Sequence, residues 1–224
     1  MQNPNLDQAR HNMVVQQVRP CEVIDDHVLE LMESVPRDAF VCEPCQNLAY
    51  TDTMIPLGRF DDNCPVMMTP IIEGRMLQAL NVQADEKVLE IGTGSGYVTA
   101  LLAKSARHVY SVEIIPALST GAREKLAGQG IHNVTLEVGD AAHGWDVHAP
   151  YDVIAITGSL PVLEENFQHS LTIGGRLFVI TGEGPAMEAL LITRTAENEW
   201  RHESLFETEL PALLNAPRPQ HFVF

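Results

Sequence analysis

Residues 87–98 read Lys-Val-Leu-Glu-Ile-Gly-Thr-Gly-Ser-Gly-Tyr-Val, and this stretch decides the fold. Its apolar start predicts a short strand, and the run from Tyr97 to Ala103 predicts a helix. Between them every second residue is a glycine, which lets the chain turn sharply and lets a ligand lie against the backbone. A helix start offers unpaired N–H groups and the positive end of the helix dipole. The stretch therefore predicts a binding site for a negative or electron-rich group.

The spacing of the glycines distinguishes between cofactors. The dinucleotide fingerprint G-x-G-x-x-G would need its third glycine at position 97, which is Tyr97. Glu90, two residues before the first glycine, is also foreign to that fingerprint. The pattern E-x-G-x-G-x-G instead resembles motif I of the S-adenosylmethionine (SAM) methyltransferases, in which the acidic residue faces the cationic amino-acid end of the cofactor. This resemblance implies SAM as cofactor and S-adenosylhomocysteine (SAH) as product.

Strands and helices alternate after this motif. Strands are predicted over residues 107–113, 134–140 and 151–157, with a helix over residues 117–128. Alternation at this spacing predicts a parallel sheet that binds ligands at the carboxyl ends of its strands.

Several polar and small residues fall together on that edge of the predicted sheet. Glu113 ends the second strand, where a carboxylate is placed to accept hydrogen bonds from ribose hydroxyls. Gly92, Asp140 and Thr157 lie at the ends of neighbouring strands. The alternative is that Glu113 and Asp140 are ordinary turn residues at strand ends.

The segment before the glycine motif is predicted to form the substrate side. Residues 8–48 suggest two or three helices, and residues 71–80 another helix. The irregular residues 49–70 between them are the natural lid. One of the early helices is expected to start at Asp25 or Asp26, to end at Val35-Pro36, and to place on one face Ile24, Val28 and Leu31 or Met32.

The C-terminal part completes the predicted architecture. Residues 176–180 suggest a fifth strand, residues 188–195 and 199–207 a hairpin, and the proline-containing tail an extended segment. The fold class is α/β, a Rossmann-like, mostly parallel sheet with helices on both faces, an N-terminal helical extension and a C-terminal hairpin. We expect a single domain built from residues 1–82, 83–183 and 184–224.

Composition excludes several partners. The formal net charge is −16, which argues against binding nucleic acid through its phosphates. No apolar run approaches the roughly 20 residues that span a bilayer. The first residues lack the basic and apolar regions of a signal peptide, so a cytoplasmic location is expected. Whether the protein is a monomer or a homodimer is left open.

The four cysteines include a C-x-x-C pair, Cys42 and Cys45. This spacing occurs in redox sites and in half of a zinc site. However, no second C-x-x-C or C-x-x-H follows, and Cys21 and Cys64 would complete a thiolate set only by irregular spacing. The sequence favours free thiols and no metal.

A longer series of motifs lies, in order, at residues 13–18, 35–41, 48–52, 55–58, 88–103, 109–113, 139–140, 149–152 and 174–177. Together they resemble the protein-L-isoaspartate O-methyltransferases. The resemblance covers about residues 9–182, which is far more than a cofactor loop. It implies methylation of the free α-carboxylate of L-isoaspartyl residues in damaged proteins, giving an ester that collapses to a succinimide and permits repair.

Carried over residue by residue, the resemblance places Tyr50, Asp52 and Pro56 in the lid. It also implies a cofactor site at the glycine bend and the strand ends. The residues predicted to bind the cofactor are Glu90, Ile91, Gly92, Thr93, Gly94, Ser95, Gly96, Tyr97, Glu113, Ile114, Gly139, Asp140, Ala141 and Thr157.

The acceptor side departs from the family pattern. Arg59 stands where a histidine is expected, a short insertion follows it, and Met68 replaces the family's active-site serine, with Thr69 beside it. Met68 cannot donate a hydrogen bond to a carboxylate. Our hypothesis is that Thr69 or Arg59 supplies the missing donor, with Ser159 a further candidate. Alternatively, Arg59 points into solvent beside the acidic residues Asp61 and Asp62.

The chemistry needs few catalytic groups. Methyl transfer from a sulfonium is an in-line displacement that depends mainly on alignment. A carboxylate is already ionised at pH 7, so no general base is required. The Asn/Asp-Pro-Pro-Tyr motif of amino-directed methyltransferases is missing at residues 157–161. His143 and Trp145 could flank the adenine, but a surface His143 and a packing Trp145 are favoured.

Two other functions remain open at this level. The fold could serve a methyltransferase for a different, small-molecule acceptor. It could also serve a SAM-binding protein without catalysis that contacts a partner through the altered lid.

Overall fold

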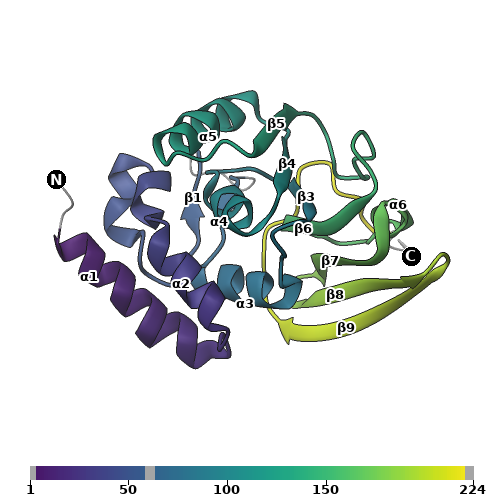
Figure 1. Ribbon diagram of the computed structural model, residues 1–224, viewed down its shortest axis with the longest axis horizontal. Coiled ribbons are helices and arrows are strands. Elements are labelled where there is room, and N and C mark those ends of the chain that lie inside the picture. The colour runs from purple at the N-terminus through teal and green to yellow at the C-terminus, as the bar shows by residue number, and fades with distance from the viewer. Residues whose placement is uncertain (1–3, 59–63, 220–224) are drawn as a thin grey trace, which may run out of the picture.

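A seven-stranded sheet forms the centre of the molecule (Figure 1), as seen in a computed structural model that describes residues 4–58 and 64–219. Its strand order is β5-β4-β3-β6-β7-β8-β9. Strands β3 to β7 run parallel, and β8 and β9 are antiparallel to their neighbours. The strands are β3 (Lys87–Ile91), β4 (His108–Glu113), β5 (Val134–Val138), β6 (Tyr151–Leu160), β7 (Leu171–Glu183), β8 (Ala186–Ala196) and β9 (Glu199–Glu207).

The glycine motif lies at the middle of this sheet. β3 pairs with β4 on one side and with β6 on the other, and Val88 to Ile91 are buried. Strands covered on both faces read as continuous apolar runs, which is why the short run at Val88 predicts a strand. The predicted C-terminal hairpin is confirmed, because β8 and β9 pair across residues 197–198. The α/β fold class is confirmed as well.

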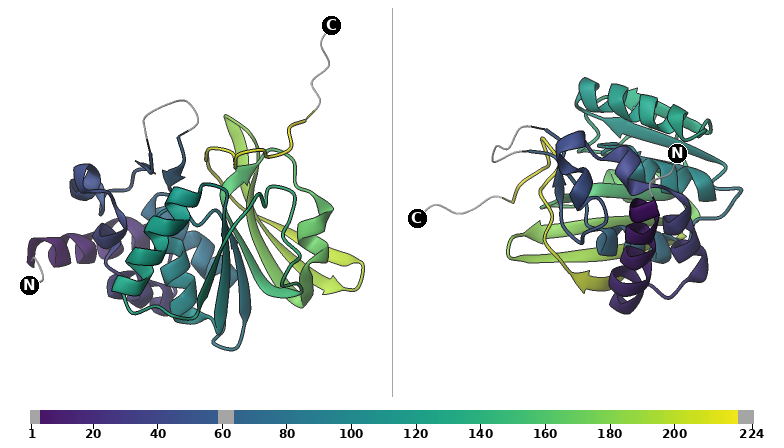
Figure 2. Two further views of the ribbon diagram at one scale, coloured as in Figure 1. Left: turned by 90° about the horizontal axis from the view of Figure 1, so that it is seen from above. Right: turned by 90° about the vertical axis from the view of Figure 1, so that its left-hand side faces the viewer.

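Helices cover one face of the sheet (Figure 2). Their buried side chains form a single apolar cluster with Val88, Val109 and Phe178 of the sheet. These helices are α2 (Asp26–Ser34), α3 (Pro70–Leu80), α4 (Tyr97–Ser105) and α5 (Pro116–Gly128), and α1 (Pro4–Asn12) packs outside them.

The opposite face carries a second apolar cluster and much less helix. Only the short α6 (Glu165–His169) contributes a helical side chain, Phe167, within the described residues. Trp145 from a loop and Leu213 and Ala216 from the C-terminal tail also pack against this cluster. The prediction of helices on both faces is therefore confirmed, but in the described part of the chain one face is covered by four helices and the other by one short helix.

The N-terminal region corrects one expected core residue. Ile24 is 76% exposed and lies before α2, so it does not share the buried face of that helix. The reason is the cap: the Asp25 carboxylate accepts a hydrogen bond from the His27 N–H, and the helix starts only at Asp26. Val28, Leu31 and Met32 are buried, as expected. Helix also begins earlier than residue 8, at Pro4.

The predicted lid segment is closed at its base by a short antiparallel ladder. Strands β1 (Ile55–Pro56) and β2 (Val66–Met67) pair Ile55 with Met67 and Pro56 with Val66. The predicted acceptor residue Arg59 lies outside the described residues. In the part of the chain that the structure describes, the helices are all too short or too polar to cross a bilayer.

Candidate active site

The glycine bend between β3 and α4 adopts a backbone that other residues rarely take. Gly92, Gly94 and Gly96 all have positive φ, at 93°, 53° and 86°. Space is limiting too, since a Cβ on Gly92 would lie 2.5 Å from the Thr157 Oγ1. A Cβ on Gly96 would lie 3.1 Å from that of Ala122 in α5. The bend therefore needs glycine both for its turn and for its close packing.

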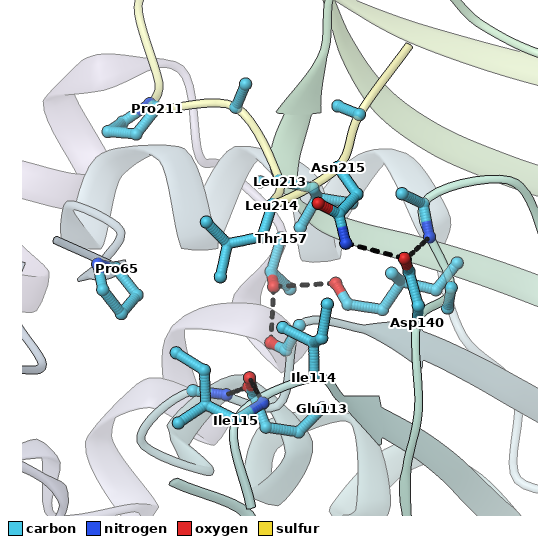
Figure 3. Close-up of a pocket in the computed structure, with 18 of the residues that line it drawn as sticks. Pro65, Glu113, Ile114, Ile115, Asp140, Thr157, Pro211, Leu213, Leu214 and Asn215 are labelled. Atoms are coloured by element: carbon cyan, nitrogen blue, oxygen red, sulfur yellow. Dashed lines mark hydrogen bonds between the residues drawn. The ribbon is translucent and has the colours of Figure 1, made fainter. Parts of the chain in front are cut away.

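Glu113 holds this bend against the end of β4 (Figure 3). Its Oε2 accepts a hydrogen bond from the Gly94 N–H at 2.8 Å, and its Oε1 accepts one from the Ile115 N–H at 2.9 Å. The side chain is 5% exposed and faces a cavity. Each carboxylate oxygen has a further lone pair, so Glu113 can still accept hydrogen bonds from a ligand.

The cavity has a volume of about 500 Å³ and lies at the carboxyl ends of β3, β4, β5 and β6. Volumes of this size are typical of cofactor sites. Residues 64–66 close it on the lid side, and the tail from Leu210 to Arg218 forms the opposite wall. The predicted cofactor residues that line it are Ile91, Gly92, Gly94, Glu113, Ile114, Gly139, Asp140, Ala141 and Thr157.

Asp140 is tied to the tail. Its Oδ1 accepts a hydrogen bond from the Ala142 N–H at 3.1 Å, and its Oδ2 accepts one from the Asn215 side-chain amide at 2.8 Å (Figure 3). Asn215 has a left-handed backbone, with φ of 63°, which aims the amide back toward the sheet edge. The two acids Glu113 and Asp140 thus face the same cavity from neighbouring strands.

Sequence reasoning missed the tail as a wall of the cavity. Three hydrogen bonds anchor it to Ser159 in β6: Ser159 N–H to Pro211 O at 3.0 Å, Leu213 N–H to Ser159 O at 2.9 Å, and Ser159 Oγ to Leu210 O at 2.8 Å. Ser159 is therefore not a donor for an acceptor in the cavity, as one hypothesis held, because its buried hydroxyl serves the tail. Two of these bonds are main-chain contacts, which leave no residue signature in the sequence.

Five predicted cofactor residues lie around the bend but do not line this cavity: Glu90, Thr93, Ser95, Gly96 and Tyr97. Thr93 and Ser95 line a small adjoining cavity. Tyr97 is fully buried, with its ring 5.6 Å from that of Phe40, between ring centres.

Glu90 lies beneath the bend rather than beside the cavity. Its Oε2 accepts hydrogen bonds from the hydroxyls of Thr99 at 2.5 Å and Ser111 at 2.6 Å. Its Oε1 is buried and has no hydrogen-bond partner among the described residues. Burial raises the pKa of Glu90 to about 8, against the lowering effect of the two hydroxyls. A buried, unsatisfied carboxylate oxygen next to a glycine bend leaves room for a donor from a ligand or water.

The acceptor side is organised by Arg37, which is fully buried. Its Nη1 donates to the Ala49 carbonyl at 3.0 Å, its Nη2 donates to the Met68 carbonyl, and its Nε forms an ion pair with Glu73 at 3.1 Å. Burial raises the pKa of Glu73 to about 7, opposed by the charge of Arg37. One guanidinium thus fixes both ends of the predicted lid onto α3.

Met68 and Thr69 sit where the lid meets α3. The Met68 side chain is 3% exposed and lines the small cavity that shares Gly92, Gly94 and Thr157 with the larger one. Thr69 caps α3: its Oγ1 accepts a hydrogen bond from the Ile72 N–H. A capping hydroxyl keeps its own hydrogen free to donate.

The residues after Asp140 take structural positions. Trp145 donates from its Nε1 to the Glu137 carboxylate at 2.7 Å and lies against Gly139, where a Cβ would come within 2.6 Å of its ring. The exposed His143 pairs with Glu164 at 2.8 Å. Neither side chain lines the cavity, in agreement with a packing Trp145 and a surface His143.

Comparison with known sequences finds one family over most of the chain. The family model for protein-L-isoaspartate(D-aspartate) O-methyltransferase matches residues 9–209. Protein-L-isoaspartate O-methyltransferase 2 of Pelobacter propionicus is 36% identical over 95% of this chain and 93% of its own length. The protein-L-isoaspartate O-methyltransferase of Syntrophus aciditrophicus is 38% identical over 89% of this chain and 91% of its own.

Solved structures share the fold. A protein-L-isoaspartate O-methyltransferase superimposes with a TM-score of 0.78 at 23% identity, covering 91% of this chain and 65% of the other. A Plasmodium falciparum protein described as the same kind of enzyme, solved in complex with SAH, gives a TM-score of 0.75 at 20% identity. This superposition covers 91% of this chain and 98% of the Plasmodium falciparum chain.

Proposed function

Because the chain belongs to the protein-L-isoaspartate(D-aspartate) O-methyltransferase family, we propose that it transfers the methyl group of SAM to the free α-carboxylate of L-isoaspartyl residues. It is a SAM-dependent methyltransferase of the protein carboxyl type. The products are SAH and a methyl ester, which collapses to a succinimide.

The observation that supports this function best is the cavity where the glycine bend and Glu113 meet. SAM carries a sulfonium and an ammonium group, and the cavity offers the carboxylates of Glu113 and Asp140 among apolar side chains. The residues present therefore fit SAM. When bound, SAM supplies an activated methyl group, and we propose that the predicted cofactor residues that line the cavity hold it here.

The acceptor needs alignment rather than activation. Bound SAM would supply the electrophilic methyl group, so the protein's part is to hold the acceptor carboxylate in a fixed position and orientation toward it. The buried Arg37 fixes the Met68 carbonyl beside the small cavity, so the lid has a rigid anchor on the acceptor side. We propose that the Thr69 hydroxyl or Arg59 donates to the acceptor carboxylate in place of the family's serine.

The acceptor itself is proposed to be a damaged protein or peptide and not a nucleic acid. The net charge of −16 favours this choice, because a polyanion would be repelled. We propose that the enzyme is cytoplasmic, because newly damaged proteins are accessible to it there.

The experiment is methyl transfer from labelled SAM to an isoaspartyl peptide, with the matched aspartyl peptide as control. We expect a base-labile methyl ester on the isoaspartyl peptide only. Turnover solely on other acceptors would mean that the substrate is a different molecule. Binding of SAH without any turnover would indicate a SAM-binding protein without catalysis.

Variants at the lid then identify the hydrogen-bond donor. Thr69→Gly removes the hydroxyl but costs the helix N-cap little stability. Thr69→Ser keeps both the hydroxyl and the N-cap hydrogen bond. If Thr69 is the donor, Thr69→Gly raises the KM for the peptide and Thr69→Ser does not. If Arg59 is the donor, activity persists in Thr69→Gly and is lost in Arg59→Ala. Met68→Ser is expected to retain activity in either case.

A further inference from the structure

The Cys42-Glu43-Pro44-Cys45 turn contains two thiols that the methyl transfer reaction does not use. Cys42 is exposed and immediately precedes a 3₁₀ helix, Glu43–Leu48, in which Cys45 is the third residue. The Cys45 N–H donates a hydrogen bond to the Cys42 carbonyl at 2.9 Å, which closes a turn between the two cysteines. All four cysteines of the chain are free. The described residues contain no group of three or more His, Cys, Asp or Glu side chains that could bind a metal ion.

The turn brings the two side chains together. Cys42 is the N-cap of the 3₁₀ helix, and the hydrogen bond from the Cys45 N–H closes a four-residue turn, whose end Cα atoms lie less than about 7 Å apart. Disulfides join cysteines whose Cα atoms are about 4.4–6.8 Å apart, so this turn has a suitable span. The two thiols are also in contact: the pKa of Cys45 is raised, first by its hydrogen bond with the Cys42 side chain and then by burial.

The two thiols differ in access and surroundings. Cys42 is exposed, whereas Cys45 is 8% exposed. Lys125 of α5 donates a hydrogen bond to the carbonyl of Phe40, two residues before Cys42, at 2.7 Å. An accessible thiol with a second, buried thiol behind it is the arrangement of an attacking and a resolving cysteine.

We propose that Cys42 and Cys45 form a thiol–disulfide exchange site that reacts with low-molecular-weight disulfides. The Cys42 thiolate attacks one sulfur of the small disulfide, forms a mixed disulfide and releases one thiolate, which takes a proton from water. Cys45 loses its proton to water and attacks the Cys42 sulfur, releasing the second thiolate. Two protein thiols are oxidised to one disulfide, and one small disulfide is reduced to two thiols.

The position of this site connects it to the acceptor side. The turn lies between Phe40, which packs against Tyr97 of α4, and Ala49, whose carbonyl is held by Arg37. Closing the disulfide would therefore fix the segment that leads into the predicted lid. The proposal concerns the thiols alone and stands whether or not isoaspartyl peptides are the acceptor.

Peptide mapping of the native full chain tests the proposal. The protein is incubated with excess oxidised glutathione, its remaining thiols are alkylated, and it is digested with trypsin. Cleavage after Arg37 and Arg59 gives residues 38–59, which contain Cys42 and Cys45 but neither Cys21 nor Cys64. We expect this peptide to lose the mass of two hydrogen atoms and to carry neither glutathione nor the alkylating agent.

Serine variants separate the attacking thiol from the resolving thiol. Cys45→Ser should accumulate glutathione on Cys42, at least about tenfold more than Cys42→Ser accumulates on Cys45. Cys21→Ser is the matched control and should behave as the wild type. The proposal is overturned if both thiols in residues 38–59 stay alkylated, if wild type retains glutathione on Cys42, or if Cys21 and Cys64 react equally fast. The wild-type result needs no variant to fold.

Discussion

The side-chain amide of Asn215 donates a hydrogen bond of 2.8 Å to the carboxylate of Asp140, which joins the C-terminal tail to the end of β5. Asp140 is a predicted cofactor residue, so the tail and the cofactor site share one side chain. The same tail is bound to Ser159 of β6 by main-chain hydrogen bonds. The cavity wall is therefore attached to two strand ends and not merely laid across them.

Changing Asn215 should loosen that wall. Asn215→Asp places two carboxylates in contact, whereas Asn215→Gly removes the amide but keeps the left-handed backbone available. We expect Asn215→Asp to weaken SAH binding roughly tenfold, with a smaller loss in Asn215→Gly. Calorimetry measures the affinity, and hydrogen exchange of residues 208–218 reports the loosening. Equal affinities for both variants and wild type would show that the bond does not support the site.

Gly158 should be intolerant of a side chain because of Leu213. A Cβ at position 158 would lie 2.6 Å from the Leu213 Cδ2 and 2.9 Å from its Cγ. Gly158→Ala is expected to lower the free energy of unfolding by about 1–3 kcal/mol and to weaken SAH binding. In a Leu213→Ala background the same change should cost much less. Urea unfolding of the four proteins gives this double-mutant cycle, and a cost independent of residue 213 would contradict it.

Glu113 should contribute strongly to cofactor affinity. Glu113→Gln turns one of the two oxygens that accept from Gly94 and Ile115 into a donor, so one backbone N–H loses its partner. Hydrogen bonds to charged groups contribute about 1.5–3 kcal/mol, so we expect roughly a tenfold to hundredfold rise in the Kd for SAH. Calorimetry measures it. The exposed Glu124→Gln on α5 is the control and should bind as wild type does.

Glu90 should make stability depend on pH. Burial raises its pKa to about 8, whereas an unfolded chain has about 4.5, so the folded state holds the proton more tightly. Its contribution to stability is then full below pH 4.5 and is lost as pH rises through about 8. The unfolding free energy of wild type minus that of Glu90→Gln should fall by on the order of a few kcal/mol between these limits. Urea unfolding of both proteins across this pH range measures the difference. Because Glu73 titrates similarly in both proteins, its contribution to the unfolding free energy cancels in the subtraction. A difference independent of pH would show that Glu90 ionises as freely as in solution.

The buried pair of Arg37 and Glu73 should be costly to break but replaceable. Arg37→Met leaves the Glu73 carboxylate buried without its charge partner, which should cost about 3–5 kcal/mol of unfolding free energy. Arg37→Met combined with Glu73→Met should recover much of that loss. Turnover of the isoaspartyl peptide should stay low in the double variant, because the Met68 and Ala49 carbonyls lose their donor. Full recovery of turnover would mean that Arg37 has no positioning role.

The sheet could be predicted because its signals are local. β3, α4 and β4 follow from an apolar run, a glycine bend and a second apolar run, each readable within a few residues. The sequence predicts Glu113 and Asp140 at one edge of the sheet because parallel strands end together. The Glu113 and Asn215 variants described above measure their contribution to cofactor binding.

The tail and the role of Ser159 could not be predicted because their contacts are distant in sequence. Ser159 and Leu210 are joined by a hydroxyl and by main-chain geometry, and neither residue type requires the other. Ile24 was misplaced for a local reason, since the choice of Asp25 as cap excludes it from the helix. The position of the Glu90 side chain could not be predicted either, because an acidic residue within a strand can face a cavity or lie beneath the glycine bend.

The two-residue ladder that pairs Ile55 with Met67 and Pro56 with Val66 has an evolutionary consequence. It seals the base of the loop, so insertions between these strands change the loop without pulling on β3 or α3. Doubling the length of such a loop adds only about 0.6 kcal/mol of closure entropy. Natural variation, or deliberate grafting, can therefore change the length of this loop while β3 and α3 keep their places in the fold.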